Sequence, residues 1–253
     1  MRSLFFLLIF LLSSSASLAD ESELHLFTKS LDSTLKKINR SECLRCLPQS
    51  QFGDIQISEY DGQKVSVVSE KQIQKIFAEL KKNKDIPYGF TVAGCDEKSH
   101  EISRLLLLQG ITPLKGFLKV ADPRSDLMKV AHPSKPGKFV EFYYHVAPVI
   151  LVHKNGKNIP YSIDPTYEQR AVPTLEWQSR FTKLNAKARL KLEYRSADSY
   201  GEQGRKIDFA DPEINRSNLE ALKEFKRYSE LPNGEDEWLN MRQMQEWKMN
   251  SAD

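Results

Sequence analysis

The stretch GKFVEFYYHVAPVILVHKNGKNIPYSIDP, residues 137–165, predicts a β-hairpin at the centre of the fold. From 140 to 152 every second residue is apolar, which is the period of a strand with one buried face. Asn155-Gly156 is the strongest short hairpin signal, and a second strand is expected over 159 to 163. Pro160 cannot donate a ladder hydrogen bond, so the returning strand should be an edge or contain a bulge.

The register of this hairpin decides which polar side chains meet. If Asn155-Gly156 is a two-residue turn, paired residue numbers sum to 311 and Asp164 lies opposite residue 147. His145 is two residues from that position and therefore on the same face of the sheet. Diagonal neighbours on adjacent strands are about 7–8 Å apart, within reach of a ring and a carboxylate. The simplest register therefore predicts that Asp164 lies beside His145, although a one-residue slip would separate them.

A second decisive stretch is VAGCDEKSH, residues 92–100, in which a cysteine directly follows a glycine. Asp96 and Glu97 suit the first turn of a helix that should run from Cys95 to residue 109. The free N–H groups and the dipole at a helix start lower a thiol pKa, whereas the two acidic neighbours act in the opposite direction. Gly94 would allow a tight turn and a close approach of substrate to the sulfur.

Cys95, His145 and Asp164 together match the requirements of thiol acyl-transfer chemistry. A thiol needs a base, an imidazole can serve, and a carboxylate beside the imidazole fixes its tautomer. Backbone N–H groups at the helix start can stabilise an oxyanion. Each residue also has a structural interpretation: a small core cysteine, a structural histidine on a strand, and an Asp that forms a turn before Pro.

The first residues, MRSLFFLLIFLLSSSASLA, predict a signal peptide over 1–19, with Asp20 beginning the mature chain. Its apolar run is too short to cross a bilayer, which takes about 20 residues. We therefore expect an exported protein, periplasmic or extracellular, without a membrane anchor after signal cleavage. The formal net charge of +3 for 253 residues does not indicate nucleic acid as a partner.

Two further cysteines, Cys43 and Cys46, form the motif CLRC. Zinc would need additional Cys or His ligands at matching spacing. In an exported chain a local disulfide is the favoured interpretation, with two unremarkable cysteines as the alternative. That leaves Cys95 unpaired, and an odd cysteine in an exported protein either pairs with another chain or is a free reactive thiol.

Other helices are predicted from apolar periodicity. They cover 22–39, 69–83 with Ser69 and Gln72 in capping-box positions, and two segments on either side of Pro232. A hairpin is expected over 55–68 around Asp61-Gly62. Met and Trp recur in the last helix, which we interpret as packing.

The segment from about Glu70 to Phe181 resembles the bacterial protein-glutaminase (protein-glutamine deamidase) family. The resemblance is carried by IPYGFTVAGCDEKSH, FYYHVAPVIL, YSIDPTY and a nearby Trp177. In that family a basic residue and a His lie three and five positions after the cysteine, as Lys98 and His100 do here. The resemblance covers somewhat under half of the chain.

The resemblance implies a Cys-His-Asp site at Cys95, His145 and Asp164, which deamidates protein- or peptide-bound glutamine through a thioester. It implies that the substrates are proteins or peptides and that no metal or cofactor is required. We expect the protein to be a monomer. The implied fold is α+β, with the nucleophile-bearing helix packed on an antiparallel sheet, as in the transglutaminase and papain-like core. Gly94 would support the oxyanion, and His100, about 140° around the helix from Cys95, would support the structure.

The expected organisation is a signal peptide (1–19), an N-terminal extension or short pro-segment (20–65), a catalytic domain (66–204) and a helical C-terminal extension (205–253). A cysteine protease or a transglutaminase would use the same three residues and differ in substrate or acceptor. A non-catalytic exported binding protein with a buried Cys95 is the alternative from another class.

Overall fold

A computed structural model describes residues 52, 55–121 and 127–250, with the side chains of 246–250 excepted. The predicted signal peptide, the helix over 22–39 and the pair Cys43 and Cys46 lie outside this part of the chain. The elements run in the order β1 (Gln56–Tyr60), β2 (Gln63–Ser69), α2 (Glu70–Lys81), α3 (Cys95–Leu108), β3 (Leu114–Val120), β4 (Met128–Ala131), β5 (Phe139–Phe142), β6 (Tyr144–Lys154), β7 (Lys157–Ser162), β8 (Val172–Pro173), α4 (Thr174–Thr182), β9 (Leu190–Ser196), β10 (Ser199–Tyr200), β11 (Arg205–Lys206), α5 (Pro212–Ser229) and α6 (Gly234–Asn250).

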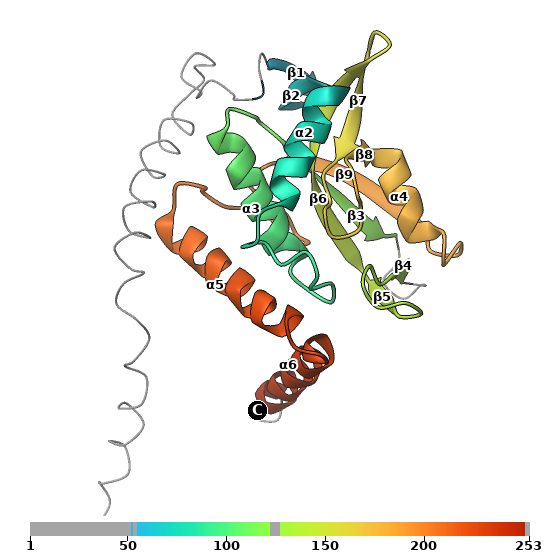
Figure 1. The fold of residues 1–253 in the computed structure, drawn as a ribbon, viewed down its shortest axis with the longest axis vertical. Coiled ribbons are helices and arrows are strands. Elements are labelled where there is room, and N and C mark those ends of the chain that lie inside the picture. The colour runs from blue at the N-terminus through green and yellow to red at the C-terminus, as the bar shows by residue number, and fades with distance from the viewer. Residues whose placement is uncertain (1–51, 53–54, 122–126, 251–253) are drawn as a thin grey trace, which may run out of the picture.

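The main sheet is built around the long strand β6. The strand order is β1-β2-β6-β3-β9, and β7 pairs with both β6 and β8. All pairs are antiparallel except β2 with β6, which is parallel. Helices α2 and α3 lie on one face of the sheet and α4 on the other (Figure 1). The α+β class with a helix packed on the sheet is confirmed.

Both predicted hairpins are confirmed, and their turns explain the registers. Asp61 and Gly62 have φ of 51° and 70°, and Asn155 and Gly156 have φ of 52° and 73°. Two consecutive positive φ values match the twist of the flanking strands, and Asn, Asp and Gly adopt them at little cost. In the second hairpin Val149 pairs with Ser162, which is the register predicted above.

The first strand of that hairpin differs from the prediction in two respects. It is interrupted at Tyr143, because β5 leaves the main sheet to pair with β4 in a separate two-stranded sheet. Both faces of β6 are also buried, since Ile150 packs with α2 and α3 while Val149 packs with β2 and β3. The alternation of apolar residues therefore predicted the strand correctly. It predicted neither the break at Tyr143 nor the burial of the second face of β6.

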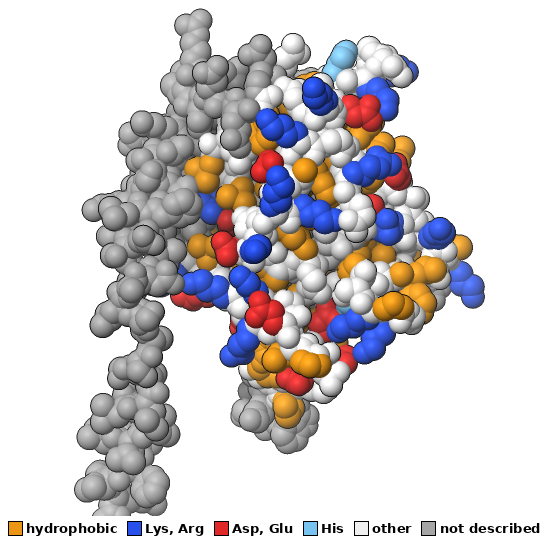
Figure 2. Space-filling view, in the orientation of Figure 1, with side chains coloured by type: hydrophobic (Ala, Val, Ile, Leu, Met, Phe, Trp, Pro, Cys, Tyr) orange, Lys and Arg blue, Asp and Glu red, His pale blue; other side chains and the backbone are white. Residues whose placement is uncertain are grey.

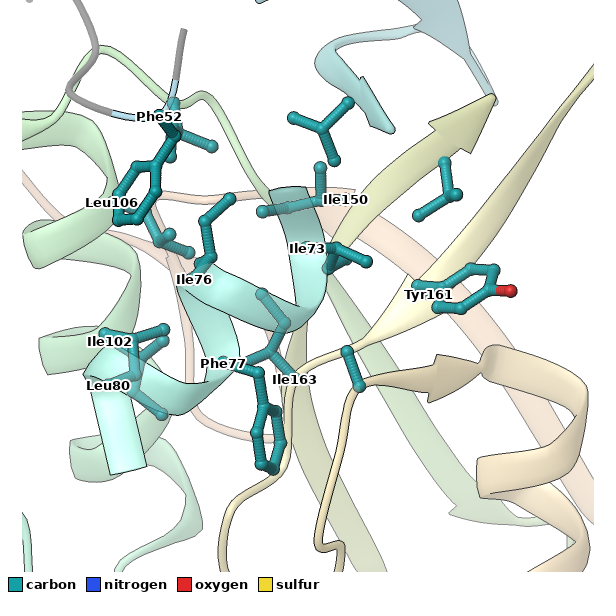
Figure 3. Close-up of a cluster of buried hydrophobic side chains, with 14 of the residues drawn as sticks. Phe52, Ile73, Ile76, Phe77, Leu80, Ile102, Leu106, Ile150, Tyr161 and Ile163 are labelled. Atoms are coloured by element: carbon teal, nitrogen blue, oxygen red, sulfur yellow. The ribbon is translucent and has the colours of Figure 1, made fainter. Parts of the chain in front are cut away.

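Helix α2 begins with the predicted capping box. The Gln72 backbone N–H donates to the Ser69 hydroxyl, and the Ser69 backbone N–H donates to the Gln72 side-chain oxygen. Its buried face consists of Ile73, Ile76, Phe77 and Leu80, which pack against Ile102 and Leu106 of α3 and Ile150 of β6 (Figure 3). This cluster fixes α3 on the sheet and therefore fixes the position of its first residue, Cys95.

Helices α5 and α6 come after the strands in the chain, and they lie on the same side of the molecule as α3, which contacts α5 (Figure 1). Leu222 and Phe225 are buried and pack with Phe90, and Trp238 of α6 joins this cluster. In the part of the chain that the structure describes, no helix is both long and apolar enough to cross a membrane. Figure 2 shows cationic and anionic side chains interspersed over one face of the molecule.

Candidate active site

Cys95 and His145 line one cavity of about 650 Å³, and the C-terminal helices α5 and α6 form its opposite side. A second, much smaller space behind it is lined by Cys95, His145 and Asp164 together. The three residues come from the start of α3, the start of β6 and the loop after β7. The fold thus brings all three predicted site residues to one place.

Cys95 is the first residue of α3 and is half-buried. Gly94 has φ of 80°, a left-handed conformation, and no side chain caps the helix. Burial raises the pKa of the Cys95 thiol well above its ordinary value, and the charges of Asp96 and Glu97 raise it further. The Lys98 ammonium and a hydrogen bond from the Val146 backbone act in the opposite direction. The raised pKa favours the thiol over the thiolate, so a neighbouring base would assist its ionisation.

His145 Nε2 lies 2.8 Å from Asp164 Oδ2, and both side chains are buried. The hairpin register places them together, because the Ile163 backbone N–H still donates to the Pro148 carbonyl after the last strand residue. Trp177 Nε1 donates to the same Oδ2 at 2.9 Å. Burial alone would raise the pKa of the Asp164 carboxyl, but His145 and the two hydrogen bonds hold it below its usual value.

Four aromatic rings surround the His145 imidazole. Phe142 stacks on it at 5.5 Å between ring centroids, while Tyr167, Trp177 and Phe181 contact it at 5.4, 5.7 and 5.1 Å. These rings fix the imidazole plane and keep water from its sides. They come from β5, a loop and α4. Phe142 and Tyr167 lie within the motifs quoted above, but no pattern in the sequence predicted that the four rings meet at His145.

Two neighbours of Cys95 hold the helix start in place. The Asp96 carboxylate accepts hydrogen bonds from the Tyr144 hydroxyl and, at 3.0 Å, from the Gly201 backbone N–H. Lys98 is buried and donates to the Phe90 carbonyl at 2.5 Å. Burial lowers the pKa of Lys98, while the nearby Cys95 and Asp164 raise it. Sequence reasoning assigned Asp96 only to the helix dipole and missed this anchoring contact.

His100 is fully buried away from the cavity. Its Nε2 lies 3.2 Å from Asn215 Oδ1, and its ring stacks on Phe209 at 4.8 Å. Burial lowers the pKa of His100 to about 3, so the ring is neutral over the ordinary pH range. The side chain joins α3 to α5 through Asn215 and to the segment before α5 through Phe209, as a structural support would.

The far side of the cavity is formed by the C-terminal helices. Ala221, Glu224 and Phe225 of α5 and Trp238, Met241, Arg242 and Gln245 of α6 line it. Trp238 and Met241, which belong to the Trp and Met pattern interpreted above as packing, thus also line the cavity beside Cys95. Among the described side chains, which end at Gln245, no three His, Cys, Asp or Glu residues are grouped to hold a metal ion.

Comparison with known proteins finds a match for the segment of the chain that contains these three site residues. Residues 73–181, which include Cys95, His145 and Asp164, match the family model Gln_deamidase_2, described as glutaminase. The matched segment, which is under half of the chain, is therefore similar to the glutaminase family. No curated protein matches the chain.

Solved structures of protein-glutaminases share the fold of this protein. The NMR structure of protein-glutaminase from Chryseobacterium proteolyticum matches with a TM-score of 0.51 and 18% identity, over 63% of this chain and 88% of that one. A crystal structure of protein-glutaminase matches with a TM-score of 0.50 and 15% identity, over 63% and 90%. A crystal structure of pro-protein-glutaminase gives 0.52 and 18%, over 66% of this chain but only 62% of that one. At these identities the likeness establishes the fold.

Proposed function

We propose that this protein is a hydrolase that converts protein- or peptide-bound glutamine to glutamate and releases ammonia. Cys95 is the nucleophile, His145 the general base and acid, and Asp164 the residue that orients His145. The observation that carries this proposal is the joint position of Cys95 and His145 at one cavity, with Asp164 bonded to His145 at 2.8 Å, inside the glutaminase match.

In the first half-reaction the Cys95 sulfur attacks the side-chain amide carbon of glutamine. His145 takes the thiol proton as the sulfur–carbon bond forms, because the raised pKa of Cys95 disfavours a thiolate before the substrate is attacked. His145 Nε2 is engaged with Asp164, so Nδ1 is the nitrogen that exchanges the proton. The protonated imidazole then gives this proton to the leaving nitrogen, the carbon–nitrogen bond breaks, and ammonia leaves a thioester on Cys95.

In the second half-reaction water hydrolyses that thioester. His145 removes a proton from the water as its oxygen bonds to the acyl carbon, and returns the proton to sulfur as the carbon–sulfur bond breaks. Glutamate leaves and the Cys95 thiol is restored. Backbone N–H groups at the start of α3, including that of Cys95, stabilise the oxyanion of both tetrahedral intermediates, and Gly94 leaves them approachable.

Ammonia release from an unfolded protein such as casein tests the proposal directly. Casein incubated with the protein should release ammonia, and its glutamine peptides should gain the small mass of an amide becoming an acid. A glutamine peptide should also react, whereas the same peptide with asparagine should react poorly, because its shorter side chain leaves the amide one methylene short of the sulfur. The absence of ammonia from both casein and the glutamine peptide would refute the proposed activity.

An excess of a lysine analogue separates hydrolysis from the related chemistries. We expect glutamate to remain the main product, since the family match is to glutaminases. Dominant incorporation of the amine would indicate a transglutaminase, and backbone cleavage without deamidation would indicate a protease.

We further propose that the protein is exported with residues 1–19 as its signal peptide and acts on proteins outside the cytoplasm. The support is the sequence pattern of a basic start, an apolar run and small residues before Asp20. N-terminal sequencing of protein from the exported fraction should begin at Asp20, or later if residues 20–65 are removed. A chain that retains Met1 would contradict the export proposal.

A further inference from the structure

The C-terminal helices form a second wall of the cavity, opposite Cys95 and His145. This wall lies outside residues 73–181, the part that matches the glutaminase family. Its contacts with the main domain are specific, and they leave the cavity open between the two walls.

A single buried carboxylate docks α6 on the main domain. Glu235 Oε1 accepts hydrogen bonds from the Thr91 backbone N–H at 2.6 Å and the Thr91 hydroxyl at 2.7 Å. Glu235 Oε2 lies 2.7 Å from His132 Nε2 and 2.5 Å from Lys135 Nζ. Since Thr91 is four residues before Cys95, this contact ties α6 to the segment that leads into the nucleophile.

An aromatic cluster docks the same wall a short distance away. Phe225 of α5 stacks on Phe90 with 4.9 Å between ring centroids, and Trp238 of α6 meets both rings edge-on at 5.6 and 5.9 Å. A Cβ atom on Gly94 would lie 2.7 Å from the Phe225 ring, so the wall approaches the nucleophile loop closely. The helices are thus held at a fixed distance from Cys95.

The space left between the walls is suited to a polypeptide segment. Its volume of about 650 Å³ falls within the ~300–1,000 Å³ typical of ligand sites, enough for a glutamine side chain and its adjoining backbone. Glu224 and Arg242 bring charges of opposite sign from the C-terminal side. Within the described part of the chain neither takes part in a salt bridge, and the Arg242 guanidinium lies over the Trp238 ring at 5.6 Å.

We propose that α5 and α6 are a substrate-binding wall, in which Arg242 and Glu224 pair with charged residues that flank the target glutamine. The inference rests on the proposed deamidation and adds to it a source of sequence preference. Arg242 favours an acidic neighbour of the glutamine and Glu224 a basic one, because each lines the cavity without a salt-bridge partner among the described residues.

Charge reversal on the wall tests this inference. Two peptides that differ only in an acidic or a basic residue beside glutamine are compared by kcat/KM. Arg242→Glu should lower the ratio of kcat/KM for the acidic peptide to kcat/KM for the basic peptide about three- to tenfold. This is the size expected when a partly exposed ion pair becomes a like-charge contact. Glu224→Lys should raise the same ratio by a similar factor. Lys223→Glu is the matched control, since it changes charge on α5 without lining the cavity, and should leave the ratio unchanged.

Binding of the same peptides to the Cys95→Ala chain gives the same comparison without turnover. Wild-type protein that releases no ammonia would refute the proposed function alone, and the binding ratios would still test the wall. Ratios that do not respond to either substitution, in turnover or in binding, would overturn the inference. It would also be overturned if both variants accelerate both peptides equally, because the helices would then be a cover that obstructs the cavity.

Discussion

The two walls of the cavity are held in place by different kinds of interaction. On the catalytic side, a helix start and a hairpin register place Cys95, His145 and Asp164, so main-chain hydrogen bonds set their positions along the chain and side-chain contacts such as those of Asp96 then hold them. On the C-terminal side, α5 and α6 are held by side chains, chiefly Glu235 and the Phe90 cluster. Geometry set by the main chain survives most substitutions, whereas docking by a few side chains can be changed or lost by one.

The largest expected effect is on the catalytic wall, from Cys95→Ala. Loss of the nucleophile should abolish ammonia release, while the small change in side-chain volume should leave the fold intact. Ammonia release and thermal unfolding of the same sample provide the two measurements. The variant Cys43→Ser with Cys46→Ser is the control and should remain active, since neither residue is assigned to the site. Turnover that persists in Cys95→Ala would remove Cys95 from the mechanism.

The next effect concerns the orientation of His145. His145→Ala should be nearly as severe as the loss of Cys95, because the thiol loses its base. Asp164→Asn should slow kcat by roughly 10²–10⁴-fold, since an amide no longer fixes the imidazole tautomer. Trp177→Phe removes the indole N–H that donates to the same Asp164 oxygen but keeps an aromatic ring at this buried position, and it should slow kcat less. Full kcat in Asp164→Asn would show that the carboxylate has no part in orienting His145.

The same contrast explains what could be predicted from the sequence. The capping box of α2, the two Asx-Gly turns and the pairing that joins His145 to Asp164 are local signals, and each was confirmed as a structural feature. Apart from Phe142, the rings around His145 come from distant positions in the chain, as do the partners in the hydrogen bond from Thr91 to Glu235. Thr91 and Glu235 are separated by 144 positions, and no periodicity can link positions so distant. The break at Tyr143 was missed because the alternation continues through it while the partner strand changes.

A smaller effect tests the place where the two walls touch. Gly94→Ala should destabilise the protein by about 2–3 kcal/mol, because a positive φ costs about 1–2 kcal/mol and the new methyl group meets Phe225 at 2.7 Å. Gly62→Ala is the matched control, with φ of 70° and nothing within 4 Å of the added Cβ. Urea unfolding of both variants separates backbone strain from the contact. Equal destabilisation would mean that Phe225 yields freely and that the walls are not tightly apposed.

The smallest effect is expected at the carboxylate that docks the C-terminal wall. The Glu235 pKa is lowered from 4.5 to about 2: burial raises it, but the hydrogen bonds from Lys135, Thr91 and His132 lower it by more. A carboxyl whose folded-state pKa is depressed stabilises the fold above its unfolded value, and this stabilisation is lost as pH falls toward the folded value. Glu235→Gln should therefore cost about 2 kcal/mol at pH 7, the size of a lost charge-assisted hydrogen bond.

The pH dependence of that variant distinguishes the buried carboxylate from an ordinary surface charge. The difference in unfolding free energy between wild type and Glu235→Gln should be full above pH 4.5 and shrink as pH falls toward about 2. Asp236→Asn is the control, because its carboxylate meets Lys138 only at the surface at 3.3 Å, and it should change stability by less than about 1 kcal/mol. Urea midpoints at pH 7 and pH 3 measure both variants. If the Glu235→Gln difference is as large at pH 3 as at pH 7, the stabilisation does not come from the charged carboxylate, and the docking of α6 depends on the aromatic cluster instead.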